Sequence, residues 1–238
     1  MKPISIGVPS KGRLQANTID WFEARGLRIV RDGAEREYSA AVEGMDGVSV
    51  VMLSAGEIPR ELAAGRIHMG VTGEDLIRER IPEHDSIVSL ASKMGFGHAD
   101  LIVAVPSFWI DVETLHDLDE VSHDFRARHG HALRIATKYH NLTRKFLHEH
   151  GVSEYRLVDS QGATEAAPKN MSAEVIVDIT SSGETLRANH LKILSDGLIL
   201  RSEANLCISN SADWSEVAPN ARESVMEKLG LTLPSLDR

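Results

Sequence analysis

The sequence lacks the features that mark several classes of protein. Its single cysteine, Cys207, excludes an intramolecular disulfide and is consistent with a reducing compartment. No apolar run is long enough to span a membrane, and the N-terminus has neither an apolar signal segment nor a small-residue cleavage site. No internal repeat or low-complexity tract occurs. We therefore expect a cytoplasmic protein without a signal peptide or a membrane anchor.

Basic side chains are outnumbered by acidic ones. The 26 Lys and Arg residues against 35 Asp and Glu residues give a net charge of −9, whereas a general nucleic-acid binder usually has a basic face. An anionic substrate remains compatible with this balance if positive groups are concentrated locally. The 42% hydrophobic and 26% charged residues are ordinary globular values, and 238 residues suffice for one large domain or two small ones.

Short apolar runs alternate with amphipathic stretches along the chain, which is the pattern of an α/β protein. The runs predicted as strands are 4–8, 48–53, 69–71, 87–90, 101–105, 133–136, 155–158 and 175–179. The stretches predicted as helices are 14–25, 61–64, 141–150 and 218–229, the last three each closed by a glycine.

Residues 174–191 predict a buried strand that runs through a hydroxyl-rich loop into a helix. The helix N-terminus would offer free backbone N–H groups to a phosphate, and the hydroxyl side chains would add donors. Asp178 closes the strand on the same side and can accept a sugar hydroxyl or contact magnesium. The candidate phosphate-binding residues are Thr180, Ser181, Ser182, Gly183 and Thr185.

This segment has a second interpretation that involves no ligand. Ser181 and Glu184 stand at the spacing of a helix capping box, which is as consistent with the pattern as a phosphate site. The charge of Glu184 also disfavours a bound anion unless its side chain turns away. The phosphate hypothesis therefore depends on support from elsewhere in the chain.

The N-terminal segment offers that support. The strand 4–8 leads into a turn at Lys11, Gly12 and Arg13, followed by a predicted helix. Lys11 supplies a point charge and Arg13 a planar fork beside helical N–H groups, so a second anion site is plausible here. The alternative is a solvated basic turn, because charged residues mostly lie on the surface.

Five segments taken together resemble the ATP phosphoribosyltransferase family, which opens histidine biosynthesis. They occur in the order expected for the family and cover residues 4 to about 205. The segments are 9–14 with its Lys-Gly-Arg signature, 57–59 with 65 and 69–75, 134–139 with 141–143, 162–168, and 178–189.

The resemblance implies an α/β fold with two lobes of the periplasmic-binding-protein type II kind and an active site in the cleft between them. Residues 1–97 and 190–238 would form the first lobe, and residues 98–189 the second. The apolar run 101–105 is a plausible crossing between the lobes, and 192–194 with 197–201 a plausible return.

The resemblance also implies the reaction, in which phosphoribosyl diphosphate and ATP give N1-(5-phosphoribosyl)-ATP and diphosphate. The 5-phosphate would lie on the 180–185 loop, with the ribose hydroxyls near Asp178 and Glu165. Lys11, Gly12 and Arg13 would contact the diphosphate, with Lys11 and Arg13 as the catalytic residues.

Magnesium is the implied cofactor, held through the substrate with at most Asp178 as a protein ligand. The eleven histidines do not predict a dedicated metal site. The closest pairs, His129 with His131 and His148 with His150, do not share a helical face, and no cysteine or carboxylate cluster completes a ligand set.

Two positions depart from the family pattern or match it weakly. Many members place an arginine a few residues before the Asp-Ile-Pro block, where this chain has Ser54. Arg36 lies where the family often places a further phosphate-facing arginine, although a surface charge on a strand is an equal alternative.

The length suggests the short form of the family, without a C-terminal regulatory domain. Short forms work with a regulatory subunit that resembles histidyl-tRNA synthetase, so the resemblance implies a hetero-oligomer built on a catalytic homodimer. Two alternatives remain at this point: a solute-binding module of the same fold that performs no chemistry, and a phosphoribosyltransferase that uses a free base as acceptor.

Overall fold

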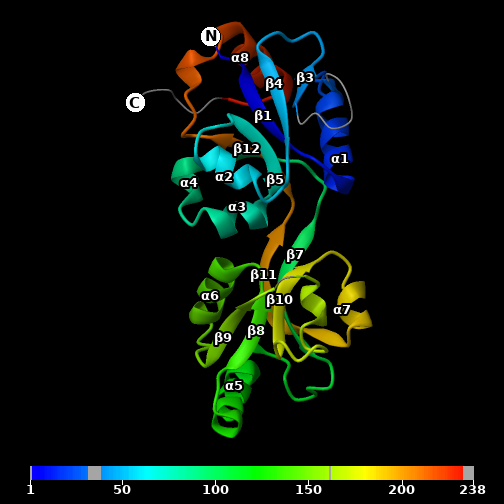
Figure 1. Ribbon diagram of the computed structural model, residues 1–238, viewed down its shortest axis with the longest axis vertical. Coiled ribbons are helices and arrows are strands. Elements are labelled where there is room, and N and C mark those ends of the chain that lie inside the picture. Colours follow the sequence, from blue (N-terminus) through cyan, green and yellow to red (C-terminus); the bar gives the residue numbers. More distant parts are fainter. Residues whose placement is uncertain (1, 32–38, 161, 233–238) are drawn as a thin grey trace. The chain divides into compact units, whose positions relative to one another are not determined.

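The computed structural model describes residues 2–31, 39–160 and 162–232. The chain divides into two compact units, one of residues Met1–Gly97 with Glu203–Arg238 and the other of residues His98–Ser202 (Figure 1). It therefore passes from one unit to the other twice, between Gly97 and His98 and between Ser202 and Glu203.

The second passage lies further along the chain than the sequence suggested. Residues 190–202, which were assigned to the first unit, belong to the second. The reason is a backbone ladder: β11 (Leu191–Ser202) pairs antiparallel with β7 (Ala99–Pro106), from Leu191 opposite Pro106 to Ser202 opposite Ala99. The two apolar runs predicted as the crossing and the return are thus neighbouring strands of one sheet.

The first unit contains a seven-stranded sheet in the order β2-β3-β4-β1-β5-β12-β6. Its central strand β1 pairs in parallel with β4 on one side and β5 on the other, whereas the outer pairs are antiparallel. The strands are β1 (Ile4–Pro9), β2 (Ile29–Arg31), β3 (Ser39–Val42), β4 (Val48–Leu53), β5 (Met69–Gly73), β6 (Val88–Lys93) and β12 (Ala204–Ser209).

Helices cover both faces of this sheet, because successive strand residues point to opposite sides. Leu206 and Ile208 of β12 belong to a cluster with Phe22 and Val225, whereas Cys207 between them belongs to a cluster with Ile77. One layer therefore holds α1 (Gly12–Glu23) and α8 (Pro219–Leu229), and the other holds α2 (Ile58–Ala63) and α3 (Glu74–Arg80). A short helix α4 (His84–Ile87) and the 3-10 turn η2 (Trp214–Glu216) complete the unit.

The second unit contains a five-stranded sheet in the order β11-β7-β10-β8-β9. Strand β10 pairs in parallel with β8, which pairs in parallel with β9, and β7 is antiparallel to β10. The remaining elements are β8 (Leu133–Thr137), β9 (Tyr155–Asp159), β10 (Val175–Thr180), α5 (Leu115–His129), α6 (His140–Glu149), η1 (Thr164–Ala166) and α7 (Glu184–Ala188).

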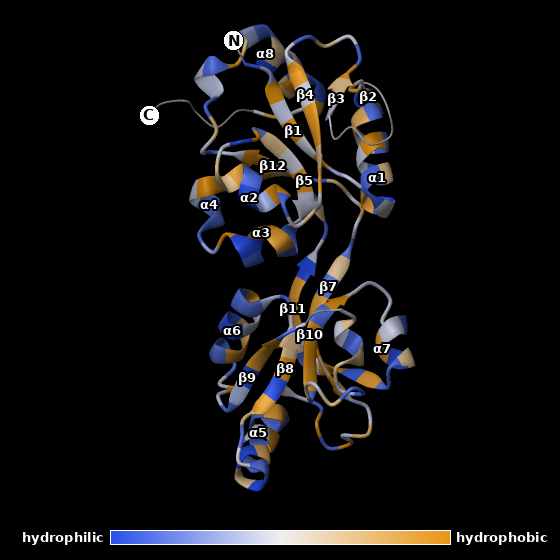
Figure 2. Ribbon diagram, in the orientation of Figure 1, coloured by the Kyte–Doolittle hydropathy of each residue, from blue (hydrophilic) through white to orange (hydrophobic). Residues whose placement is uncertain are grey.

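This sheet is also buried on both faces, so its inner strands appear in Figure 2 as near-continuous hydrophobic segments. Ile176 of β10 packs with Leu186 of α7 and Ala167, whereas Val175 and Val177 point to the other face and are fully buried. Contacts of α5 with β8 and of α6 with β11 place these helices against the sheet. No helix in the described parts of the chain is both long and apolar enough to cross a bilayer.

The turn after α2 generates a stability prediction. Gly65 has φ +67°, and a Cβ atom there would lie 2.5 Å from the backbone carbonyl oxygen of Ser211. We expect Gly65→Ala to lower the free energy of unfolding by about 1–3 kcal/mol, since both the backbone conformation and the steric contact oppose a side chain. Urea denaturation measures the difference.

The matched control is Gly56→Ala, because Gly56 has no left-handed φ and a Cβ atom there would meet nothing within 4 Å. It should change the unfolding free energy by no more than about 0.5 kcal/mol. Equal losses in the two variants would contradict the assignment of strain to Gly65.

Candidate active site

The carboxyl ends of three parallel strands meet at one edge of the second unit's sheet. Val177 of β10 pairs with Thr137 of β8, and Thr137 pairs with Asp159 of β9. The segments that follow these three strands must therefore leave the sheet side by side. In open α/β sheets this edge is where ligands bind. We refer to it as the carboxyl edge of the second unit.

The loop after β10 exposes backbone donors at this edge. The N–H of Gly183 bonds to the Thr180 hydroxyl at 3.0 Å, which folds the loop back on the strand end. Among the described residues, the backbone N–H groups of Ser181, Ser182 and Thr185 meet no acceptor. All three residues are exposed, so these N–H groups, three within five residues, are open to solvent and form a cradle suited to an anion.

The capping-box alternative is not realised in this loop. Gly183 occupies the N-cap of α7 in the left-handed conformation, and no side chain caps the helix. The Ser181 hydroxyl instead donates to the carbonyl oxygen of His98 at 3.2 Å, and the Glu184 N–H bonds weakly to the Ser182 hydroxyl at 3.4 Å. Since α7 has only five residues, its dipole adds little, and the free N–H groups themselves carry the attraction for a phosphate.

Asp178 lies half-buried at the end of β10, beside this cradle. Burial raises the pKa of its carboxyl group, and the charge of Glu165 raises it further, whereas hydrogen bonds from the Ile179 N–H and the Thr164 hydroxyl and the charge of Lys138 act in the opposite direction. The Ile179 bond is 2.9 Å long. A carboxylate in this position gains from any ligand that brings hydroxyl donors or a cation.

Glu165 and Lys138 complete the group around Asp178. Glu165 belongs to η1, which packs on β10, so the structure brings it to the carboxyl edge together with Asp178 and the loop. In the sequence, Lys138 and Thr164 belong to two of the segments that resemble the family, and no role was predicted for either residue. Lys138 follows β8 directly, and its ammonium donates to the Gly162 carbonyl oxygen at 2.8 Å. Its position after a strand that neighbours β10 was the signal that could have identified it.

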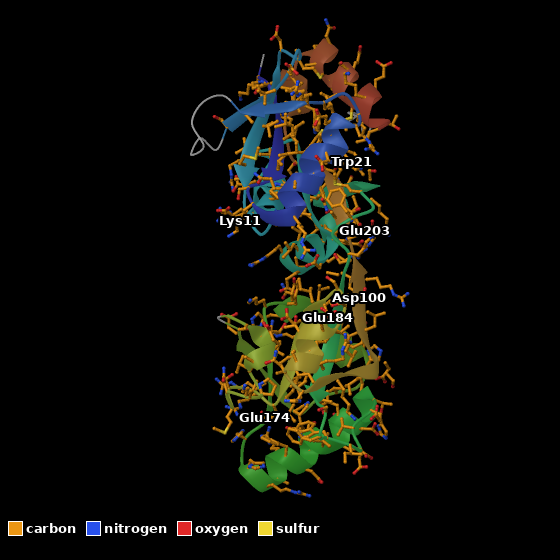
Figure 3. All side chains as sticks on the ribbon, turned by 90° about the vertical axis from the view of Figure 1, so that its right-hand side faces the viewer. Lys11, Trp21, Asp100, Glu174, Glu184 and Glu203 are labelled. Atoms are coloured by element: carbon orange, nitrogen blue, oxygen red, sulfur yellow. The ribbon has the colours of Figure 1, made fainter. Side chains whose placement is uncertain are left out.

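The first unit holds the other candidate residues. Gly12, with φ +74°, begins α1, and Lys11 is the N-cap residue, without a side-chain capping bond. Figure 3 labels Lys11 in this unit. Lys11 and Arg13 are exposed, and neither has a carboxylate partner among the described residues. Two unpaired cations at the carboxyl end of β1 are available to an anionic ligand.

Ser54 emerges beside this turn, because Pro9 pairs with Leu53 and the Ser10 N–H bonds to the Leu53 carbonyl oxygen at 2.7 Å. Hydrogen bonds from the Ser54 hydroxyl and the Ser54 N–H lower the pKa of the Glu57 carboxyl. Ser54 thus starts a turn closed by Glu57 and supplies no positive charge in place of the family's arginine. Arg36 lies outside the described residues.

Among the described residues, no group of three or more His, Cys, Asp and Glu side chains is placed to hold a metal ion. The chain therefore provides no cage of its own there. The nearby carboxylates of Asp178 and Glu165 suit magnesium that arrives with substrate phosphates, since this ion commonly takes one or two protein carboxylates and completes its shell with phosphate oxygens and water.

Comparison with known proteins decides the family. The profile of HisG, described as ATP phosphoribosyltransferase, matches residues 54–230. An ATP phosphoribosyltransferase of Cereibacter sphaeroides is 63% identical over 232 residues, which cover 97% of this chain and 98% of the relative. The chain belongs to the ATP phosphoribosyltransferase family. Members of this family are pentosyltransferases that act at the start of histidine biosynthesis.

Alignment with solved structures identifies the fold. A chain of the ATP phosphoribosyl transferase (HisG:HisZ) complex from Thermotoga maritima aligns with TM-score 0.70 at 22% identity, covering 95% of this chain and 94% of that one. The alkanesulfonate-binding protein SsuA from Xanthomonas axonopodis aligns with TM-score 0.50 at 15% identity, covering 96% and 73%. The predicted α/β fold of the periplasmic-binding-protein kind is confirmed.

The environment of Asp178 generates a prediction about stability and pH. Because burial favours the protonated carboxyl, the folded state holds this proton more tightly than the unfolded state, so ionisation near neutral pH costs stability. Asp178→Asn should therefore raise the melting temperature at pH 7. The gain should shrink as the pH falls and vanish well below the ordinary value of 3.8, where both states are protonated.

Differential scanning calorimetry between pH 3 and pH 8 measures this dependence. Asp111→Asn is the control, since Asp111 is an exposed residue of the same unit and should leave the melting temperature unchanged. A melting temperature that is lower at pH 7 in Asp178→Asn than in the original chain would contradict the assigned cost of burying the charge.

Proposed function

We propose that this chain transfers the 5-phosphoribosyl group of phosphoribosyl diphosphate to N1 of the adenine of ATP. The products are N1-(5-phosphoribosyl)-ATP and diphosphate, and the reaction is the first step of L-histidine biosynthesis in the cytoplasm. The observation that carries the proposal is the cradle of free N–H groups beside Asp178, within the segment matched by the family.

The 5-phosphate of the substrate binds the 180–185 loop. The N–H groups of Ser181, Ser182 and Thr185 donate to its oxygens, and the hydroxyls of the loop add further donors. The carboxylates of Asp178 and Glu165 accept hydrogen bonds from the ribose hydroxyls. These contacts fix the position of the anomeric carbon, and accurate positioning is a large part of the rate in a reaction between two bound substrates.

The chemical step needs no covalent intermediate. The bond between the anomeric carbon and the diphosphate oxygen breaks, the oxygen keeps the electron pair, and the lone pair of adenine N1 forms the new bond to carbon. Lys11 and Arg13, which have no carboxylate partner in the part of the chain that the structure describes, bind the departing diphosphate together with the Gly12 turn. Positive charge placed where negative charge develops favours the transition state over the ground state.

Asp178, with Glu165 nearby, would hold a magnesium ion that accompanies phosphoribosyl diphosphate. The ion would neutralise charge on the diphosphate and so complement the charges of Lys11 and Arg13.

The working form of the enzyme is a hetero-oligomer. A structural neighbour is a HisG:HisZ complex, and we propose an equivalent regulatory subunit, resembling histidyl-tRNA synthetase, for this chain. The catalytic part is a homodimer.

The direct test mixes the purified chain with ATP, phosphoribosyl diphosphate and magnesium, and follows the ultraviolet change of adenine together with release of diphosphate. Product that requires both substrates is expected. Binding of phosphoribosyl diphosphate without product, with or without the regulatory subunit, would indicate a sensor. Product with a free base in place of ATP would indicate a different acceptor.

Two substitutions test the role of the N-terminal cations. Lys11→Ala and Arg13→Ala should each lower kcat/KM by about 10- to 1000-fold, because each removes charge from the leaving diphosphate. Both side chains are exposed, so the melting temperature should not change. The control is Arg28→Ala, an exposed cation of the same unit that pairs with Glu23 and Glu43. Turnover in Lys11→Ala and Arg13→Ala equal to that of Arg28→Ala would remove both residues from the site.

A further inference from the structure

A cavity of about 510 Å³ lies in the second unit, away from the carboxyl edge. Its lining is dominated by apolar and aromatic side chains, among them Phe108, Trp109, Met171 and Leu191, with Pro106 and Pro168. We call it the distal pocket. Its size and lining are those of a binding site rather than of a packing defect.

The distal pocket and the phosphate loop lie at opposite ends of β10. Glu174, which lines the pocket, directly precedes this strand, and Thr180 at its other end begins the loop. Six residues of strand separate the two by roughly 20 Å. In Figure 3, Glu184 and Asp100 are labelled at one end of this unit and Glu174 toward the other. The wall at Glu174 is therefore far from the loop, whereas the wall at Ala188 lies one helical turn from Thr185.

The side chains at the pocket are unusually exposed for their type. Phe108 and Met171, which line it, are 73% and 80% exposed, and Ile110, next to Trp109 in the chain, is 77% exposed. Single exposed apolar residues are common on protein surfaces, but two large ones that line one cavity, with a third two residues along the chain from Phe108, mark an interaction site.

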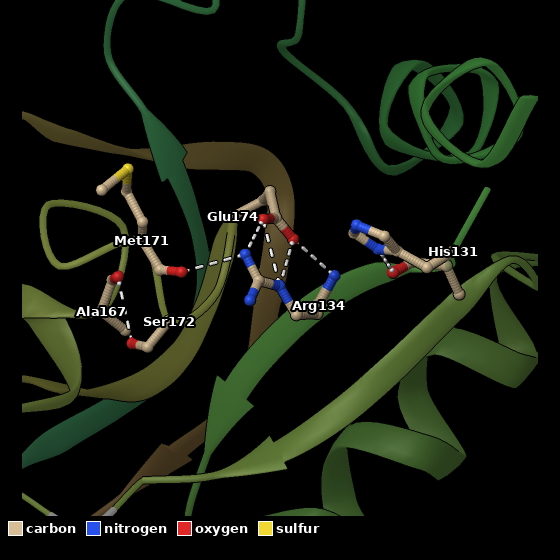
Figure 4. A network of polar contacts seen from close by, with 7 residues as sticks. His131, Arg134, Ala167, Met171, Ser172 and Glu174 are labelled. Carbon is tan, nitrogen blue, oxygen red and sulfur yellow. Dashed lines mark hydrogen bonds and ion pairs between the residues drawn. The ribbon is translucent and has the colours of Figure 1, made fainter. Parts of the chain in front are cut away.

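The wall that carries Met171 is held in place by an ion pair. Arg134 forms a bidentate contact with Glu174, and it also donates to the carbonyl oxygen of Met171 at 3.0 Å (Figure 4). The Ser172 hydroxyl donates to the Ala167 carbonyl oxygen at 3.2 Å. These bonds fix Met171 at φ +54°, a left-handed conformation that is costly for a residue with a side chain. The fold thus holds the backbone of Met171 in a strained conformation, with its side chain exposed.

The opposite wall is fixed in the same way. The Lys192 ammonium bonds to the carbonyl oxygen of Ile110 at 3.3 Å, and the Ser107 N–H bonds to the carbonyl oxygen of His190 at 2.8 Å. His190 has φ +56° and also lines the pocket. Met171 and His190 are the two non-glycine residues with positive φ in the described part of the chain, and both border this one cavity.

One basic and one acidic side chain, Lys169 and Glu174, line the pocket. Arg134 neutralises Glu174, whereas the exposed ammonium of Lys169 has no carboxylate partner among the described residues. An uncompensated cation beside an apolar cavity favours a partner that presents a carboxylate next to an apolar side chain. The chain as a whole carries a net charge of −9.

We propose that the distal pocket docks the regulatory subunit, which inserts an aromatic or long aliphatic side chain flanked by a carboxylate. This inference rests on the proposed function for the existence of that subunit. A second copy of the chain fits less well, because a two-fold contact centred on the pocket would bring the two Lys169 side chains together between chains of equal net charge.

One helix connects the docking site with the phosphate loop. α7 starts after Gly183 of the loop and ends at Ala188, which lines the pocket together with Asn189 and His190. A subunit seated in the pocket contacts the end of a five-residue helix whose other end carries the free N–H groups. Docking there therefore alters turnover through α7.

The test uses the catalytic chain together with the proposed histidyl-tRNA-synthetase-like subunit. Isothermal titration calorimetry measures their affinity, and the product assay measures stimulation. The double variant Phe108→Asp with Met171→Asp should bind the subunit at least tenfold more weakly and lose its stimulation, with its basal turnover unchanged. Lys169→Glu should weaken binding, and Lys145→Glu, an exposed lysine on α6, should not.

Val30→Asp is the matched control for an exposed apolar side chain, since Val30 is 40% exposed and lies in the first unit. Calorimetric melting verifies that each variant is folded.

Wild-type affinity in the double variant, or no binding of the subunit by the original chain, would overturn the proposal. So would dissociation of the catalytic dimer caused by the double variant alone, measured by light scattering, because the occupant would then be a second copy. If the complex forms but makes no phosphoribosyl-ATP, the proposed function fails and the docking site stands.

Discussion

Parallel pairing of buried strands is the constraint on which the rest of the structure depends. β8 and β10 are largely buried, β9 lies at the edge of the sheet, and all three run in one direction, so the segments that follow them must emerge together at one edge. The same pairing of β1 with β4 brings the Lys11 turn next to Ser54 in the first unit. Residues far apart in the sequence become neighbours because the strands before them are aligned, not because they attract one another.

The carboxyl edge of the second unit combines a partly buried charge with open hydrogen-bond donors. The Asp178 carboxyl is held where burial disfavours its charge, and three exposed backbone N–H groups meet no acceptor among the described residues. The carboxyl costs stability in the free protein, whereas the N–H groups are open to solvent, and a ligand that brings phosphate oxygens, hydroxyl donors and a cation would suit both. A sugar phosphate with magnesium has all three. The membership of the chain in the ATP phosphoribosyltransferase family agrees with this chemistry.

The local patterns of the sequence predicted much of this site. The change from an apolar run to a hydroxyl-rich loop predicted the turn between β10 and α7, and short apolar runs identified eight of the strands. Lys138 and Thr164 could not be found in this way, because their importance comes from the strand that lies next to β10. The division at residue 190 was wrong for the same reason: β11 reads as a connection until its ladder with β7 is known. The capping box at Ser181 failed because α7 begins later than the spacing suggests, with Gly183 rather than Ser181 at its N-cap.

The most direct measurement is amide hydrogen exchange of the 180–185 loop, followed by NMR with and without phosphoribosyl diphosphate and magnesium. The account predicts that the amide protons of Ser181, Ser182 and Thr185 exchange rapidly in the free protein, since they have no acceptor among the described residues, and become protected when the substrate binds. Exchange rates of these three amides that are unchanged at saturating substrate would contradict the claim that the loop holds the 5-phosphate.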